Sequence, residues 1–166
     1  MWDIVQIYFQ SFPAQAKVAK YLLDYGFSIR ERTIYIDKIR IPFSELARVL
    51  DVDKRVIIAT VNTIESNPML SKIYNNLIPA CNLTKVAPHL GWGVIEISLS
   101  EPGKPGVLGN IATIIGKANV NIKQTIGNDS SNTMNGLIYI ITEGDVPGEL
   151  INKLKMVEGV KSITLR

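Results

Sequence analysis

Cysteine and histidine are almost absent from this chain of 166 residues, which holds one of each, Cys81 and His89. A lone cysteine excludes an internal disulfide, and a lone histidine leaves a zinc site or a histidine-based catalytic triad short of side chains. The sequence also has no P-loop and no Gly-x-Gly-x-x-Gly motif, and no nucleophile, base and orienting group occur together. We therefore expect no metal, no cofactor and no enzymatic activity.

Long hydrophobic runs are lacking too. The longest, 56–59 and 137–141, are far shorter than the ~20 residues that cross a bilayer. The first ten residues do not follow a basic stretch with an apolar one, as a secretory signal would. Hydrophobic residues nevertheless make up 46% of the chain and charged residues 20%, which is ample for a buried core. We expect a soluble, cytoplasmic protein that does not bind a membrane.

The net charge of +3 is distributed unevenly along the chain. Residues 1–88 contain 11 Lys and Arg against 8 Asp and Glu, whereas residues 89–166 contain 7 of each kind. All of the basic excess therefore lies in the first half. A modest excess permits a polyanionic partner such as DNA without requiring one.

The first half has mainly helical patterning, with helices expected over 3–10 and 13–25, and Gly26 ending the second. Residues 33–36 and 38–41 alternate with period two and predict a small hairpin. Two short amphipathic helices follow over 43–50 and 54–65, with Asp51 in the turn and Asp53 as the cap of the second. Two such helices separated by about three residues predict a mostly helical, winged helix-turn-helix-like domain over 1–67.

A DNA-binding surface on this domain would use the exposed face of the second helix. Lys54, Arg55 and Asn62 are expected there and supply cations for phosphates and an amide for base edges. On the preceding hairpin, Lys38 and Arg40 could contact phosphates as a wing would, with Arg30 and Arg32 beside them. The same basic residues are equally ordinary on a solvated strand edge, where they oppose aggregation.

The second half is more regular. Strands are expected over 95–99, 120–127, 137–142 and 160–165, and helices over 107–119 and 148–158. A polar loop over 128–136 joins the second strand to the third. The resulting order is βαββαβ, the ferredoxin-like arrangement. Together with a partly helical connector over 68–90, this predicts an α+β chain whose second domain spans 91–166.

Residues 92–166 resemble the ACT domain, a small regulatory module that binds ligands. The resemblance rests on the segment 104–108 (KPGVL) after the first strand, 119–122 (NVNI) at the second, and 158–160 (EGV) before the last. It implies a ligand between this loop and the second strand, usually where two such domains meet. Carried over by position, the ligand-binding residues are Lys104, Pro105, Gly106, Val107, Leu108, Asn121, Ile122 and Gln124.

The chain as a whole is similar to archaeal regulators of amino-acid metabolism in which a helix-turn-helix-like domain precedes an ACT domain. This resemblance implies a homodimer formed through the ACT domain and a small-molecule effector, an amino acid. The first hypothesis is therefore a DNA-binding regulator of amino-acid metabolism. The alternative is a dimeric regulatory or adaptor subunit that binds a metabolic enzyme instead of DNA.

Overall fold

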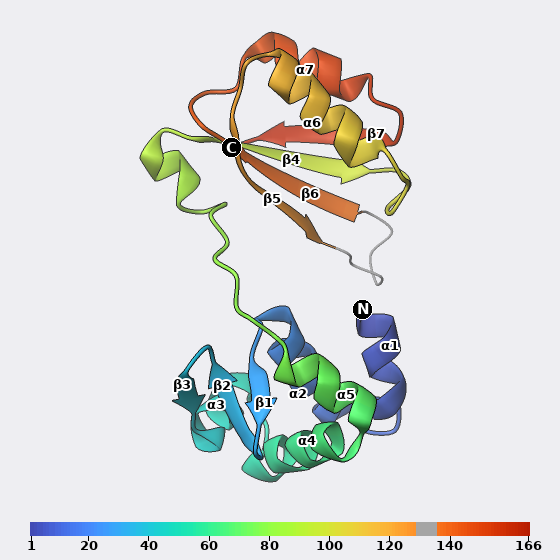
Figure 1. Ribbon diagram of the computed structural model, residues 1–166, viewed down its shortest axis with the longest axis vertical. Helices are drawn as coiled ribbons and strands as arrows, with labels where there is room; N and C mark the ends of the chain where they lie inside the picture. The colour runs from blue at the N-terminus through green and yellow to red at the C-terminus, as the bar shows by residue number, and fades with distance from the viewer. Residues whose placement is uncertain (129–135) are drawn as a thin grey trace. The chain divides into compact units, whose positions relative to one another are not determined.

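The computed structural model describes residues 1–128 and 136–166 and confirms the expected α+β class. The chain divides into two compact units, Met1–Cys81 (unit 1) and Asn82–Arg166 (unit 2), each with a hydrophobic core of its own (Figure 1). The connector expected over 68–90 is shared between them. Its first part forms a helix that packs into unit 1, and its last part packs on the sheet of unit 2.

Unit 1 is built mainly from helices that surround one core. Their bounds are α1 Trp2–Gln6, η1 Ile7–Phe9, α2 Pro13–Asp24, α3 Phe43–Leu50, α4 Lys54–Ser66 and α5 Pro68–Asn75. Apolar side chains at helical spacing on α2 and α4 meet in the core, including Leu22, Ile57 and Ile64, each fully buried. The Tyr74 hydroxyl on α5 is also buried and donates a hydrogen bond of 2.9 Å to the carbonyl of Ala19.

The junction between α3 and α4 has the geometry that the sequence predicts. Asp51 adopts a left-handed backbone with φ of 50°, and the carboxylate of Asp53 accepts the Arg55 N–H at 2.7 Å as the cap of α4. Ser44, which has a side chain suited to a helix cap, lies inside α3 and does not cap it. That helix already begins at Phe43, because Pro42 stands in the capping position with an extended backbone. The helix-turn-helix arrangement is therefore present, and α3 has the bounds that the sequence predicts.

The small sheet of unit 1 contains three strands, β1 Ser28–Arg30, β2 Thr33–Ile36 and β3 Ile39–Ile41, in that order and all antiparallel. The sequence predicted only the β2–β3 hairpin. β1 is too short to show alternation, and it forms because β2 offers it a pairing edge. Residues 31 and 32 alone connect β1 to β2, so Glu31 and Arg32 occupy a two-residue hairpin turn.

Unit 2 has the expected ferredoxin-like fold. Its elements are β4 Gly93–Leu99, α6 Val107–Lys117, β5 Ile122–Asn128, β6 Gly136–Thr142, α7 Gly148–Lys155 and β7 Val160–Leu165. The antiparallel neighbours follow the order β5-β6-β4-β7, and both helices pack on one face of the sheet (Figure 1). A short turn of helix, η2 Ala87–Leu90, packs on the other face against Val94 and Ile141.

Several boundaries in unit 2 differ from the sequence expectation by one to three residues: β4 begins at Gly93 and α6 ends at Lys117, each two residues earlier than expected, and β5 and α7 differ as well. β5 begins at Ile122 and not at Val120, because the Val120 N–H still bonds the Ile115 carbonyl at the end of α6 and Asn119 has a φ of 57°. α7 ends at Lys155, three residues earlier than expected. Of the predicted polar loop over 128–136, residues 129–135 lie outside the described part of the chain.

Two kinds of site have no counterpart in the described residues. Over 1–128 and 136–166, no helix has the length and apolar character needed to cross a membrane. Within the same ranges, His, Cys, Asp and Glu side chains do not gather in threes where a metal ion could be held.

Candidate functional site

The outer face of α4 carries the residues that the sequence assigned to DNA. Lys54, Arg55, Ile58 and Asn62 are exposed and Ala59 is half-buried, whereas Ile57, Thr60, Val61 and Ile64 on the opposite face are buried in the core. Lys54 and Arg55 follow the cap Asp53 directly, so they stand in the first turn of the helix. Asn62 lies on the same face eight residues later, roughly 12 Å along the axis at 1.5 Å per residue.

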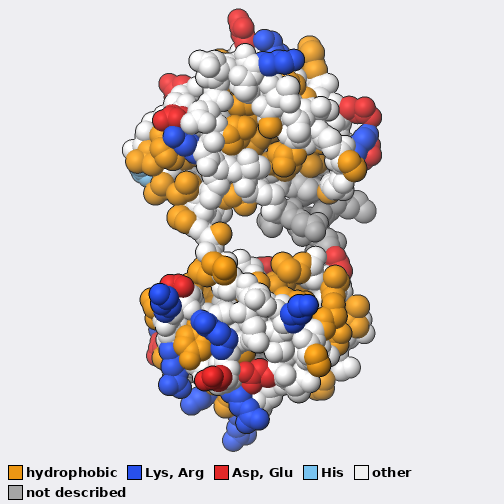
Figure 2. Space-filling view, viewed as in Figure 1, with side chains coloured by type: hydrophobic (Ala, Val, Ile, Leu, Met, Phe, Trp, Pro, Cys, Tyr) orange, Lys and Arg blue, Asp and Glu red, His pale blue; other side chains and the backbone are white. Residues whose placement is uncertain are grey.

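Basic residues from β3 and from the β1–β2 turn extend this surface. Arg40 and Lys54 line one open depression of about 240 Å³ together with Arg32, and Asn62 lines a neighbouring depression that also includes Arg32. Lys38 is not part of this set, because it lines a separate depression with Arg30 and Tyr35. Figure 2 shows Lys and Arg side chains gathered over part of unit 1.

Most of these cations have no partner among the side chains that the structure describes. Neither ion pairs nor side-chain hydrogen bonds join the described residues to the side chains of Lys38, Arg40, Lys54 or Arg55. Surface cations that are left unneutralised produce a positive potential and attract anions. The sequence predicted that Lys54, Arg55 and Asn62 would be exposed, but it could not show that no ion pair would neutralise the cations.

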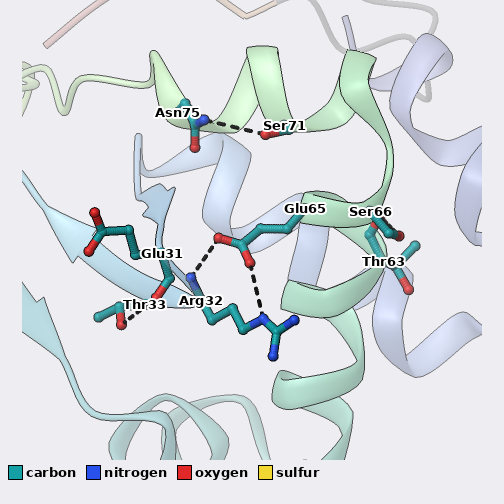
Figure 3. A network of polar contacts seen from close by, with 8 residues as sticks. All are labelled: Glu31, Arg32, Thr33, Thr63, Glu65, Ser66, Ser71 and Asn75. Atoms are coloured by element: carbon teal, nitrogen blue, oxygen red, sulfur yellow. Dashed lines mark hydrogen bonds and ion pairs between the residues drawn. The ribbon is translucent and has the colours of Figure 1, made fainter.

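Arg32 differs, because Glu65 on α4 holds it in place. One Glu65 oxygen accepts the backbone N–H of Arg32 at 2.6 Å, and the other lies 3.9 Å from the Arg32 Nε (Figure 3). Glu31 and Arg32 have φ values of 49° and 55°, a left-handed backbone conformation that residues other than glycine adopt at a cost in free energy. Glu65 thus ties a strained turn to α4 and fixes where the arginine emerges.

In unit 2, the loop between β4 and α6 presents a backbone suited to a small anion. Gly106 caps α6 with a φ of 87°, and no atom outside its own neighbours lies within 4 Å of where a Cβ would be. Such an open helix start leaves N–H groups available to a carboxylate. Pro105 and Leu108 are exposed here, whereas Val107 turns its side chain into the core and can offer only its N–H.

Lys104 forms ion pairs with two carboxylates. Its Nζ lies 2.7 Å from a Glu158 oxygen and 3.6 Å from a Glu101 oxygen. The hydrogen bond with Glu158 raises the pKa of the Lys104 ammonium, and the same bond lowers the pKa of the Glu158 carboxyl. Lys104 therefore ties the loop to the segment that precedes β7, and a ligand carboxylate would have to compete with Glu158 for it.

The other predicted ligand residues lie at the opposite end of the sheet. Ile122 at the start of β5 pairs with Thr142, whereas the loop follows Leu99, which pairs with Gly136. Six residues of β5 separate those two ends, roughly 20 Å at 3.3 Å per residue. Within one chain the structure therefore brings the loop residues 104–108 together, and it does not bring Asn121, Ile122 or Gln124 to them.

Both amides at this far end already have partners. Asn121 donates to a Glu143 oxygen at 2.8 Å, and the Gln124 oxygen accepts the Leu83 N–H at 3.0 Å. Lys123 also contacts Glu143 at 2.8 Å, and this hydrogen bond is the main reason that the pKa of the Glu143 carboxyl is lowered. Ile122 packs against the helix-covered core.

Sequence reasoning missed an apolar pocket of about 280 Å³ beside the loop. It is lined by Leu99, Pro102, Gly103, Gly127, Gly136, Leu137 and Ile138, which come from three strands and the loop. A pocket with this lining suits an apolar side chain more than a charged one. Only the pairing of β4, β5 and β6 places these residues together, so no local pattern could have indicated it.

Comparison with known families gives no match: no family model fits this chain, and no curated protein matches it. Similar solved structures include the ACT domain of a GTP pyrophosphokinase from Chlorobium tepidum. That domain is 20% identical, with a TM-score of 0.37, over 45% of this chain and 96% of its own.

Two transcriptional regulators are similar over most of the chain. One, an AsnC family regulator from Agrobacterium tumefaciens, is 7% identical over 92% of this chain and 86% of its own, with a TM-score of 0.31. The other, from Neisseria meningitidis in complex with L-Met, is 12% identical over the same shares, with a TM-score of 0.30. Likeness at this level assigns neither a family nor a function to this chain.

Proposed function

We propose that this protein is a regulator that binds DNA through the α4 surface of unit 1 and an amino-acid effector through unit 2. The observation that carries the proposal is the gathering of cations without acidic partners on one face of α4 and at the adjoining end of β3.

The α4 surface has dimensions and chemistry that suit the DNA major groove. About 12 Å of helix separates Lys54 from Asn62, close to the ~12 Å width of the groove. Lys54, Arg55 and Arg40 would contact phosphates on one side, and the Asn62 amide would face base edges. Exposed Ile58 between them would contact a thymine methyl.

The test is the salt dependence of binding to a duplex of mixed sequence, measured by fluorescence anisotropy. Replacing both Lys54 and Arg55 by Ala should lower the slope of log affinity against log salt by about 1.8, since each phosphate contact contributes ~0.9. A matched control replaces Lys153 and Lys155 of α7, which are also exposed, by Ala and should leave the slope unchanged. Equal slopes for the two double variants would contradict the assignment.

The effector site is proposed at the start of α6. Free N–H groups at Gly106 and beyond would bind the carboxylate, and the pocket beside Leu99 and Gly103 would take an apolar side chain. Asn121, Ile122 and Gln124 would complete the site from a second copy, because a homodimer that pairs opposite ends of two sheets removes the ~20 Å separation. Ligand binding would then favour one dimer arrangement over another.

A thermal-shift screen against the twenty amino acids, followed by calorimetry with any stabiliser, tests the effector site. Leu108→Asp should abolish binding by placing a carboxylate against that of the ligand, and an acidic residue in the first turn of α6 does not harm the helix. Leu165→Asp is the matched control, because both leucines are about 40% to 45% exposed and Leu165 lies at the far end of β7. Equal loss of binding in both variants would contradict this location.

The alternative, an adaptor that docks on an enzyme, has its own supporting observation in Ile58. This side chain is 39% exposed at the centre of the α4 face, where an apolar anchor would serve a protein partner. An enzyme that copurifies with the full chain, is lost with Ile58→Asp and is retained after the Lys54 and Arg55 substitutions would favour the adaptor. Absence of DNA binding at low salt would be required as well.

A further inference from the structure

The first twelve residues and α5 expose an unusual amount of apolar surface. Six side chains, which we call the α1 patch, are between 38% and 61% exposed: Met1, Ile4, Ile7, Tyr8, Phe12 and Met69. Figure 2 shows hydrophobic side chains gathered over the part of unit 1 that contains α1. The Tyr8 hydroxyl lies 3.6 Å from the Met69 sulfur, which joins the α1 segment to α5 in one continuous surface.

The α1 segment is apolar on both of its faces, and folding of unit 1 uses only one of them. Val5 and Phe9 point into the core and are at most 1% exposed. Ile4, Ile7 and Tyr8 are spaced three and four residues apart on the other face. A surface helix normally carries polar residues on its outer face, so the apolar outer face of this segment indicates an interaction surface.

Charge argues against two kinds of partner for the α1 patch, since Lys20, a cation that lies over the Trp2 ring beside it, is paired with Asp24. Residues 1–12 contain a single charged side chain, Asp3, and no Lys or Arg. Nucleic acid is bound through cations, and a helix that lies on an anionic lipid surface also carries them on its polar side. An uncharged, apolar protein surface suits the α1 patch better than either.

The area of the α1 patch is sufficient for a symmetric dimer. Six large side chains, each about half exposed, offer roughly 600 Å² if a large side chain has ~200 Å² in all. Two copies of the patch would bury about twice this area, which reaches the lower limit of ~1,200 Å² for specific interfaces. An apolar face is complementary to itself, as a two-fold contact requires.

We propose that the α1 patch binds the α1 patch of a second copy of this chain. The contact makes unit 1 a self-associating unit independently of the dimer proposed for unit 2. It rests on neither DNA binding nor effector binding. Within an assembly, it would fix the distance between two α4 surfaces, and hence between any two sites that they contact.

Site-specific crosslinking of the full chain tests whether two patches meet. In a background with Cys81→Ser, the variant Ile7→Cys is treated with a flexible bis-maleimide at low micromolar protein concentration. Ile39→Cys is the matched control, because Ile39 on β3 is 67% exposed, much as Ile7 is at 61%, and lies outside the patch. A covalent dimer from Ile7→Cys but not from Ile39→Cys is the expected result. Failure of Ile7→Cys to crosslink, or equal yields from the two, would overturn the proposal.

Sedimentation equilibrium of full-length variants measures the strength of the contact. Ile7→Glu would bury an unpaired carboxylate against its copy and should raise the dissociation constant of the unit 1 contact at least tenfold. Ile39→Glu should leave it unchanged. Thermal melting shows whether both variants stay folded, as expected for substitutions at exposed positions. If the two variants have equal dissociation constants, the patch does not hold copies together.

Discussion

Glu65 offers the sharpest test of how unit 1 holds its basic turn. The Glu65 carboxylate accepts the Arg32 backbone N–H at 2.6 Å and its side chain is only 22% exposed. A hydrogen bond to a charged group in such a place contributes about 1.5–3 kcal/mol. The Arg32 guanidinium adds little, because its side chain is 83% exposed. Glu65→Ala should therefore destabilise unit 1 by about 2 kcal/mol.

Differential scanning calorimetry of the full chain measures this loss. At ~4–8 °C per kcal/mol for a unit of this size, Glu65→Ala should lower the melting temperature of unit 1 by about 8–16 °C. Glu65→Gln keeps an oxygen that accepts the N–H and should lose about half as much. If Gln and Ala lower the melting temperature equally, the hydrogen bond to the turn is not the cause.

A double-mutant cycle checks the role assigned to strain in the turn. Asn-Gly is the preferred pair for a two-residue hairpin with both φ values positive, so Glu31→Asn with Arg32→Gly should stabilise the turn by about 1–2 kcal/mol. Arg32→Gly keeps the backbone N–H that Glu65 accepts, so part of the Glu65→Ala loss remains in that background. The part that comes from holding a strained turn should disappear, and Glu65→Ala should cost less than in the wild type. An unchanged cost would refute the coupling between Glu65 and the turn.

Three smaller predictions concern stability alone. Tyr74→Phe removes the buried hydrogen bond to Ala19 and should destabilise unit 1 by about 1 kcal/mol in chemical denaturation. Gly26→Ala should also destabilise unit 1 by more than 1 kcal/mol, because φ is 69° and the added Cβ would lie 2.7 Å from a backbone oxygen. The pKa of Glu158 is lowered in the folded state from its ordinary value of 4.5. Its pairing with Lys104 therefore stabilises unit 2 when the pH is above 4.5, and this stabilisation is lost on acidification. Glu158→Gln should therefore flatten the fall in the melting temperature of unit 2 on acidification, but only slightly, because the Glu158 side chain is 87% exposed.

Each of these has an outcome that would contradict it. Tyr74→Phe at wild-type stability would mean that water replaces the lost hydroxyl as the donor to the Ala19 carbonyl. Gly91→Ala serves as the control for Gly26→Ala, since the φ of Gly91 is 68° but no atom lies within 4 Å of the added Cβ. Equal losses of stability in the two variants would mean that the backbone angle, and not the steric contact, causes the loss at Gly26. For Glu158→Gln, an unchanged fall in melting temperature on acidification would mean that other groups in unit 2 cause the pH dependence.

Much of the fold could be predicted because local rules decide it. The turn at Asp51, the cap at Asp53 and the end of α4 before Pro68 are each set by the chemistry of one or two residues. β1 was missed because its three residues carry no pattern and depend on β2 for pairing. A contact such as Glu65 with Arg32 joins residues 33 positions apart, and no local signal encodes it.

The candidate sites divide in the same way. The exposed set on α4 follows from helical periodicity, which the sequence displays directly. The separation of the loop after β4 from the start of β5 follows from the crossover through α6, which returns the chain to the opposite end of the sheet before β5 begins. A family pattern identifies which residues could bind a ligand, but it does not show that the two groups lie ~20 Å apart within one chain.

The separate cores of the two units have a consequence for the history and the engineering of this chain. Buried side chains of Met1–Cys81 pack with one another, and those of Asn82–Arg166 do likewise, so either half can be exchanged without repacking the other. Gene fusion at the codons for residues 81 and 82 could therefore attach unit 1 to a different sensory module in a single step. A chimera joined at that point is expected to be soluble and to keep unit 1 folded, so unit 1 could be combined with other ligand-binding domains.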